Sequence, residues 1–148
     1  MIELLQLLSC FALGLLMGSL LTEAMILVPY WRTMNPDDFL RLHGTLGPQL
    51  YTYFAPLTIV ASTLPIVAAV VPLMMGLTPS LLSIVPAVIM LILLAIYFAY
   101  FKGANESFKS GSVGVERLSD ELARWAAWHW LRVTLGLIAF FISLLALR

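Results

Sequence analysis

The sequence predicts an all-α integral membrane protein, a single domain over residues 1–148 that forms a four-helix bundle in up-down-up-down order. Hydrophobic residues make up 61% of the chain and charged residues only 11%, whereas about a quarter of the residues in a soluble domain are charged. Four unbroken apolar stretches each approach or exceed the roughly 20 residues that a helix needs to cross a bilayer. Their apolar residues do not alternate with polar ones, so membrane-spanning strands are not expected.

The charge balance and the single cysteine exclude two classes of function. Eight basic and eight acidic residues give a formal net charge of +0, so the basic excess on which nucleic-acid binding rests is missing. Cys10 is the only cysteine, so no internal disulfide or thiol–disulfide exchange within the chain is expected, and we interpret it as a packing residue. The chain begins without the basic segment of a signal peptide, so its first apolar stretch is expected to remain as a membrane helix.

The four membrane helices are expected at about residues 4–30, 48–73, 80–101 and 122–147. Aromatic residues beside basic ones are typical of the headgroup layer of a membrane. This pattern ends the first helix at residues 30–32 and the third at residues 100–102, and three tryptophans between residues 125 and 130 mark the same level on the fourth. The run Ser-Asp-Glu at 119–121 predicts a helix start that leads without a break into the fourth helix.

Short extra helices are therefore expected in the two charged connections. In the first connection Asn35 is followed by proline and two aspartates, which is typical of an N-cap and a first helical turn. This helix is expected to run from Pro36 to about His43. We expect it to break at Gly44 or Gly47 before the second membrane helix begins.

Basic residues indicate which connections face the cytoplasm. The first and third connections are basic, whereas the second, around Gly76, carries no charge. The positive-inside rule therefore places the first and third connections in the cytoplasm and both termini on the other side. We expect a multi-pass protein of the cell membrane, and the compact size with short loops favours a bacterial inner membrane. The basic residues of the two connections are Arg32, Arg41, Lys102, Lys109, Arg117 and Arg124.

Two opposite charges lie inside the expected membrane helices. Glu23 precedes the aromatic end of the first helix by about seven residues, and Arg132 follows Trp125 of the fourth by seven. At 1.5 Å per residue each lies roughly 10 Å inside the interface. A charge at that depth is costly unless it is paired or hydrated, and it is a functional-site hypothesis by default. The sequence predicts that the two side chains pair, either as a packing device or as part of a site.

The fourth helix carries a stripe that suits ring-shaped ligands. Trp125, Trp128, His129 and Arg132 are spaced i, i+3, i+4 and i+7, so they are expected on one face. Two indoles, an imidazole and a guanidinium on one face are suited to a flat, oxygen-bearing ring compound. The alternative is an interfacial aromatic belt with an arginine that reaches the surface.

Further polar residues are expected at the same membrane face, where they could complete one pocket. His could act as a general base near neutral pH, and Asn or Tyr could stabilise a developing oxyanion. The candidate catalytic residues are His129, Arg132, Glu23, Asn105 and His43, and the candidate substrate-binding residues are Trp125, Trp128, Tyr51 and Tyr97.

A metal centre is the rival use of this pocket. His43, His129, Glu23 and Glu106 could supply nitrogen and oxygen ligands. The sequence contains no His-x-x-His, Glu-x-x-His or cysteine cluster, and it lacks a phosphate loop, a nucleophile elbow and a haem attachment motif. We therefore expect no metal and no cofactor.

The layout and one motif resemble the anthrone-oxygenase-like family of small four-helix membrane proteins, much of which has no assigned function. The residues that carry the resemblance are Asn105, the run Trp125-x-x-Trp128-His129-x-x-Arg132, and the first helix with Gly14, Gly18 and Pro29. The motif covers about thirty residues, and the layout covers most of the chain. At the position of His129 the family more often has asparagine.

The resemblance implies a cofactor-free oxygenase of the kind that converts an anthrone into an anthraquinone with molecular oxygen. Such an enzyme removes a proton from an activated carbon and lets the carbanion react with oxygen. By resemblance, His129 or His43 is the candidate base, and Arg132 and Asn105 stabilise the enolate.

Three functions remain open from the sequence. The first is a membrane oxidoreductase that acts on a hydrophobic aromatic or quinone-like substrate. The second is a non-catalytic accessory subunit of a larger membrane complex, or a bundle that binds lipid or pigment. The third is a small transporter, which would need oligomers because four short-looped helices make a narrow pore. The expected partners are the lipid bilayer and a hydrophobic small molecule, with a homo-oligomer or a larger membrane complex left open.

Overall fold

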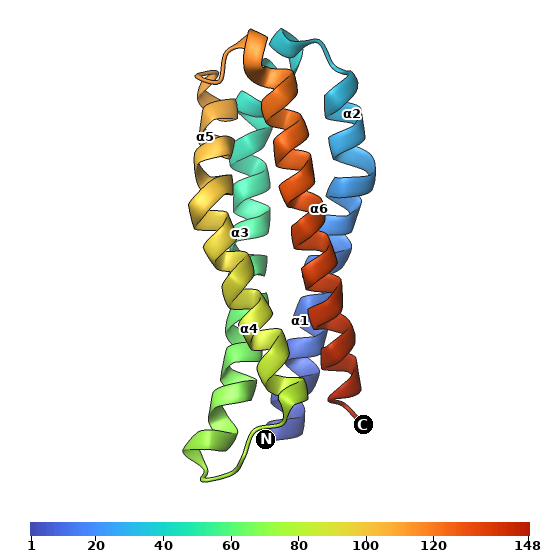
Figure 1. Cartoon of the computed structure of the whole chain (residues 1–148), viewed down its shortest axis with the longest axis vertical. Helices are drawn as coiled ribbons and strands as arrows, with labels where there is room; N and C mark the ends of the chain where they lie inside the picture. The colour runs from blue at the N-terminus through green and yellow to red at the C-terminus, as the bar shows by residue number, and fades with distance from the viewer.

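A computed structural model describes all 148 residues, and it is helical throughout, without strands. Figure 1 shows long helices packed side by side along the long axis of the molecule, with both termini at the same end. The prediction of an all-α protein is confirmed. The elements in chain order are α1 (Ile2–Thr22), η1 (Glu23–Leu27), α2 (Val28–Thr33), α3 (Pro36–Met74), α4 (Leu81–Ile96), η2 (Tyr97–Phe101), α5 (Lys102–Ser110) and α6 (Val115–Leu145).

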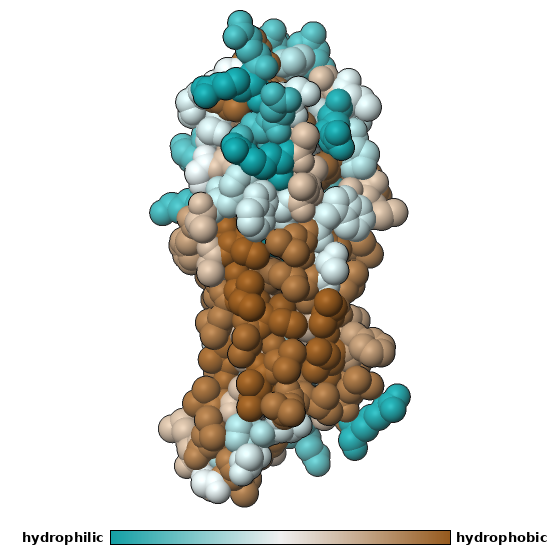
Figure 2. Space-filling view, in the orientation of Figure 1, coloured by the Kyte–Doolittle hydropathy of each residue, from teal (hydrophilic) through white to brown (hydrophobic).

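Four continuous helical segments are long and apolar enough to cross a membrane, which indicates a multi-pass membrane protein. The elements η1 and η2 are single π-helical turns that join their α-helical neighbours without a break, so α1, η1 and α2 form one rod, as do α4, η2 and α5. Figure 2 shows a broad band of hydrophobic residues across the visible face of the molecule and a large hydrophilic end above it. The four segments are Ile2–Thr33, Pro36–Met74, Leu81–Ser110 and Val115–Leu145.

The helices extend well beyond the apolar band at the hydrophilic end. The 39 residues of α3 give a rod of about 58 Å, which is nearly twice the roughly 30 Å of hydrocarbon in a bilayer. α1 packs against α3 and α6, and α4 packs against the same two helices. The hydrophilic end is therefore built from the same four rods, and side chains one or two turns outside the band remain buried between helices.

The predicted break at Gly44 or Gly47 is wrong, because α3 runs unbroken from Pro36. Its start is as predicted, since the Asn35 side chain accepts a hydrogen bond from the Asp37 backbone N–H at 3.1 Å. A glycine costs a helix only about 1 kcal/mol relative to alanine, so packing can override it. At position 47 a side chain would press on His43, because an added Cβ would lie 3.3 Å from His43 Cδ2.

Two other predicted boundaries move outward. α6 begins at Val115 rather than near residue 120, and the third rod continues to Ser110 rather than ending at residue 101. Gly111 and Gly114 have φ angles of 71° and 73°, and this left-handed conformation suits glycine. These two glycines therefore set the ends of both helices, and the charged residues between them and the apolar band are helical.

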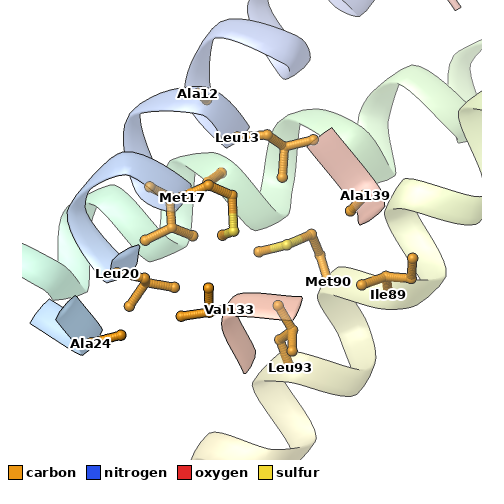
Figure 3. Packing of buried hydrophobic residues seen from close by; sticks show 12 residues of the cluster. Ala12, Leu13, Met17, Leu20, Ala24, Ile89, Met90, Leu93, Val133 and Ala139 are labelled. Atoms are coloured by element: carbon orange, nitrogen blue, oxygen red, sulfur yellow. The ribbon is translucent and has the colours of Figure 1, made fainter. Parts of the chain in front are cut away.

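The interior consists of two clusters stacked along the bundle axis. The aliphatic cluster lies within the apolar band and includes Leu13, Met17, Met90 and Val133, whose side chains point toward one another in Figure 3. The aromatic cluster lies toward the hydrophilic end. It is built around Trp31, Phe39, Phe101, Phe108 and Trp125.

The aromatic cluster corrects the prediction of interfacial anchors. Trp31 and Trp125 are 3% and 4% exposed, and their rings meet edge to face with centroids 6.1 Å apart. They pack inside the bundle because the helices continue past the expected interface and enclose them. Among the aromatic residues expected at the membrane interface, Tyr30, Trp128 and Trp130 are exposed, as membrane anchors would be.

Gly136 on α6 leaves room for the Met17 side chain of α1, and replacing it with leucine is expected to destabilise the fold by about 1–3 kcal/mol, the usual cost of overpacking. The terminal atoms of Met17 fill the space where a Cβ would stand. Thermal unfolding in detergent measures the effect. Gly18→Leu is the matched control, because nothing lies within 4 Å of its added Cβ. Shortening Met17 to alanine in the Gly136→Leu background should restore part of the loss, and its failure to do so would contradict this packing.

Candidate functional site

Glu23, His129 and Arg132 come together inside the bundle, at the junction of the aliphatic and aromatic clusters. Glu23 Oε2 lies 4.0 Å from Arg132 Nη2 and 3.6 Å from His129 Nε2. The side chains are 7%, 0% and 14% exposed for Glu23, His129 and Arg132 respectively. The predicted pairing of the two membrane charges is thus confirmed.

His129 links the two helices that carry the charges. Its Nε2 lies 3.0 Å from the backbone oxygen of Leu20 on α1, and its Nδ1 lies 2.9 Å from Arg132 Nη2. A guanidinium can only donate, so Nδ1 accepts from Arg132 and Nε2 carries the proton donated to Leu20. His129 is therefore neutral, with both nitrogens engaged.

One hydrogen-bond donor of Arg132 has no partner. Its Nε is buried and has no hydrogen-bond partner, which is costly for a polar group in an apolar interior. Its guanidinium carbon stands 3.9 Å from the centroid of the Phe101 ring, an arrangement that stabilises a cation. An oxygen atom placed beside Nε would satisfy this donor.

Two π-helical turns flank the charged cluster. Glu23 is the first residue of η1, and η2 runs from Tyr97 to Phe101. π-Turns are rare and are frequent at functional sites. Phe101, which supports the guanidinium, was not among the residues predicted from the sequence. A π-turn has no simple sequence signature, so only the structure could locate it.

Two predicted substrate-binding tyrosines lie on the α3 and α4 side of the cluster. Tyr51 belongs to α3, and Tyr97 is the first residue of η2. Tyr51 is 64% exposed, whereas Tyr97 is partly buried.

Trp125 and Asn105 are joined to each other, and both contribute to the packing around the cluster. The indole N–H of Trp125 donates to Asn105 Oδ1 at 2.8 Å, and the indole stacks on the His129 ring with centroids 4.8 Å apart. The Trp125 ring therefore helps to hold the His129 imidazole in place.

Trp128 does not share the buried face of the predicted stripe. It is 37% exposed and stacks on the ring of Tyr100 with centroids 5.7 Å apart. The predicted stripe is therefore split between two environments. Trp125, His129 and Arg132 face the centre of the bundle, whereas Trp128 is turned away from it.

His43 lies apart from the charged cluster. It is buried among aromatic rings, stacked on Phe39 at 5.2 Å and edge-on to Trp31 and Phe108. His43 contacts Trp31, which contacts Trp125, which in turn stacks on His129. The expectation that His43, Glu23 and His129 line one pocket stays a prediction.

The four residues of the rival metal site do not come together. No group of three or more His, Cys, Asp or Glu side chains is arranged to hold a metal ion. Glu106 is instead exposed and pairs with Lys109 at 3.5 Å. Glu23 and His129 lie 3.6 Å apart, but neither His43 nor Glu106 joins them in a group of three.

The fold and the site define an α-helical membrane protein with a buried carboxylate, imidazole and guanidinium at the boundary of its apolar band. Comparisons with protein-family models, with curated proteins and with solved structures found no match to this chain. The function is therefore argued from the site itself.

Proposed function

We propose that this chain is a small membrane oxidoreductase of the anthrone-oxygenase-like type, which uses molecular oxygen without a cofactor to oxidise a hydrophobic aromatic or quinone-like substrate. The observation that carries the proposal is the buried cluster of Glu23, His129 and Arg132, with its unpartnered Arg132 Nε donor. An ionisable cluster at this depth is costly, which favours a functional role. The resemblance in the fourth helix supplies the reaction type.

Glu23 is the best-placed base in this proposal. Its Oε2 lies 3.6 Å from His129 Nε2 and 4.0 Å from Arg132 Nη2, beyond hydrogen-bond distance of either. A lone pair of this oxygen therefore remains free to accept the proton of a substrate C–H. His129 has no free nitrogen, and Asn105 Oδ1 already accepts from Trp125. The roles of base and orienting group are thus divided between Glu23 and His129.

The reaction would proceed through an enolate. Glu23 takes a proton from the activated CH₂ carbon, and the electron pair moves to the substrate carbonyl oxygen, which accepts a hydrogen bond from Arg132 Nε. Oxygen then takes up the electrons and bonds to the carbon, and loss of water from the hydroperoxide leaves a new ketone. Overall, one CH₂ group and O₂ give one C=O group and water. A donor aimed at a developing oxyanion typically contributes 10²–10³-fold in rate, or roughly 3–4 kcal/mol.

The proposed topology is a four-helix bundle in up-down-up-down order, consistent with both termini lying at one end (Figure 1). The hydrophilic end carries the basic connections and would face the cytoplasm of a bacterial cell. Entry of the substrate from the bilayer past Tyr51 and Tyr97 would bring a ring compound to Arg132. The partners are then the bilayer, the hydrophobic substrate and oxygen.

A non-catalytic bundle is the second candidate, as an accessory subunit or a lipid- or pigment-binding protein. It is favoured by the tight packing around the cluster, where His129 bonds to both Leu20 and Arg132 and stacks on Trp125. Such a network would lock α1 against α6 without chemistry.

Oxygen uptake by the purified protein separates the two functions. With an anthrone as substrate in detergent or nanodiscs, the oxidoreductase consumes one O₂ for each quinone formed, above the rate of spontaneous oxidation. A protein that binds the compound without accelerating oxygen uptake would be the non-catalytic bundle. Mass spectrometry of small molecules that co-purify identifies the compound in either case.

A further inference from the structure

A groove outside the charged cluster lies between α5 and α6 at the hydrophilic end. It is an open groove of about 660 Å³. Figure 2 shows the hydrophilic residues gathered at this end, directly above the hydrophobic band. The polar side chains that line the groove are Ser107, Ser112, Arg117, Asp120, Glu121 and Arg124.

The groove offers one free cation and one free anion on adjacent turns. Arg124 forms an ion pair with Glu121, whose other oxygen accepts from the Tyr100 hydroxyl at 2.8 Å. The ion pairs of the chain include neither Arg117 nor Asp120. These two residues are i and i+3 on α6, so their Cβ atoms are about 5–6 Å apart.

The charges of the groove sum to zero, which distinguishes between ligand classes. Two arginines face two carboxylates, Asp120 and Glu121. A purely anionic group gains from the arginines but is repelled by the unpaired Asp120. A zwitterion gains at both signs of charge, because its phosphate meets Arg124 and its ammonium meets Asp120, one helical turn further from the apolar band.

The position of the groove identifies the source of such a zwitterion. Arg124 stands one helical turn, or about 6 Å, above the exposed Trp128, and Trp128 stacks on Tyr100 of the groove wall. Tryptophan at the rim of an apolar band is typical of the membrane interface, and the headgroup layer extends about 5–7 Å beyond the hydrocarbon. The Arg124 end of the groove therefore lies at headgroup level, and Asp120 lies about 6 Å further out.

We propose that the α5–α6 groove binds the headgroup of a zwitterionic aminophospholipid, with phosphate on Arg124 and ammonium on Asp120. The acyl chains descend past Trp128 along the apolar face. The shared chemistry, a phosphate beside an ammonium, is also that of free phosphoethanolamine, and the acyl chains distinguish the two.

Native mass spectrometry of the delipidated protein in non-ionic detergent tests this assignment. The probes are dioctanoyl phosphatidylethanolamine, dioctanoyl phosphatidylglycerol and free phosphoethanolamine. We expect the ethanolamine lipid to bind about three- to fivefold more tightly than the glycerol lipid, as one partly exposed ion pair allows. Free phosphoethanolamine should not compete at the same concentration.

Asp120→Asn should abolish the preference by weakening only the ethanolamine lipid, whereas Arg124→Gln should weaken both lipids. Glu116→Gln is the matched control, since Glu116 is exposed on the same helix and does not line the groove. Both carboxylate variants alter exposed positions, which seldom affect folding. Equal binding of the two lipids to the unchanged protein, or equal effects of the two carboxylate variants, would overturn the proposal. Competition by free phosphoethanolamine would overturn the lipid as the source.

Discussion

Replacing Arg132 with alanine is expected to lower oxygen-dependent turnover of the aromatic substrate at least about 100-fold while the protein still inserts into the membrane. The guanidinium carries the buried, unpartnered Nε donor, and loss of one oxyanion donor typically costs 10²–10³-fold in kcat. Insertion depends on the summed hydrophobicity of the four segments, which this substitution raises. Oxygen uptake by purified protein gives the rate, and membrane fractionation gives the insertion.

Arg132→Lys separates positioning from charge in this experiment. Lysine keeps the cation but has no counterpart to Nε, so most of the activity should still be lost. Arg32→Gln is the control, because Arg32 is exposed and makes no ion pair. Full activity of Arg132→Ala would remove the site from consideration, whatever the result with lysine.

Replacing Glu23 with alanine is expected to lower the free energy of unfolding by about 3 kcal/mol, because it leaves the Arg132 cation without its buried counter-charge. The carboxylate is only 7% exposed and lies 4.0 Å from the guanidinium, so solvent does little to screen the loss. Unfolding by denaturing detergent in mixed micelles, followed by helical circular dichroism, measures the change.

A double substitution tests whether charge or packing is responsible. Glu23→Gln with Arg132→Gln removes both charges and keeps polar side chains of similar size, so it should recover most of the stability but no activity. Glu106→Ala is the matched control, since its pair with Lys109 is exposed and such pairs contribute at most about 1 kcal/mol. If Glu23→Ala lowered the free energy of unfolding no more than Glu106→Ala, the buried pair would not stabilise the fold.

The long apolar runs determined the helical class and the number of candidate spans, because hydrocarbon admits few other backbone structures. They also made Glu23 and Arg132 conspicuous, and their similar depth predicted the pairing that the structure contains. The cap at Asn35 followed from local chemistry and is present. Each of these features depends on one or two helical turns or on composition, which the sequence displays directly.

Tertiary packing decided the remainder. Gly44 and Gly47 read as breaks, yet contacts along α3 outweigh their small helix penalty. Trp31 and Trp125 read as interfacial anchors, yet neighbouring helices extend past them and enclose them. Which of the predicted site residues meet depends on how the rods rotate about their axes, so Trp128 and His43 lie outside the cluster and Phe101 lies within it. Rotation is set by side chains that interlock across helices, and a single chain read in order carries no record of those contacts.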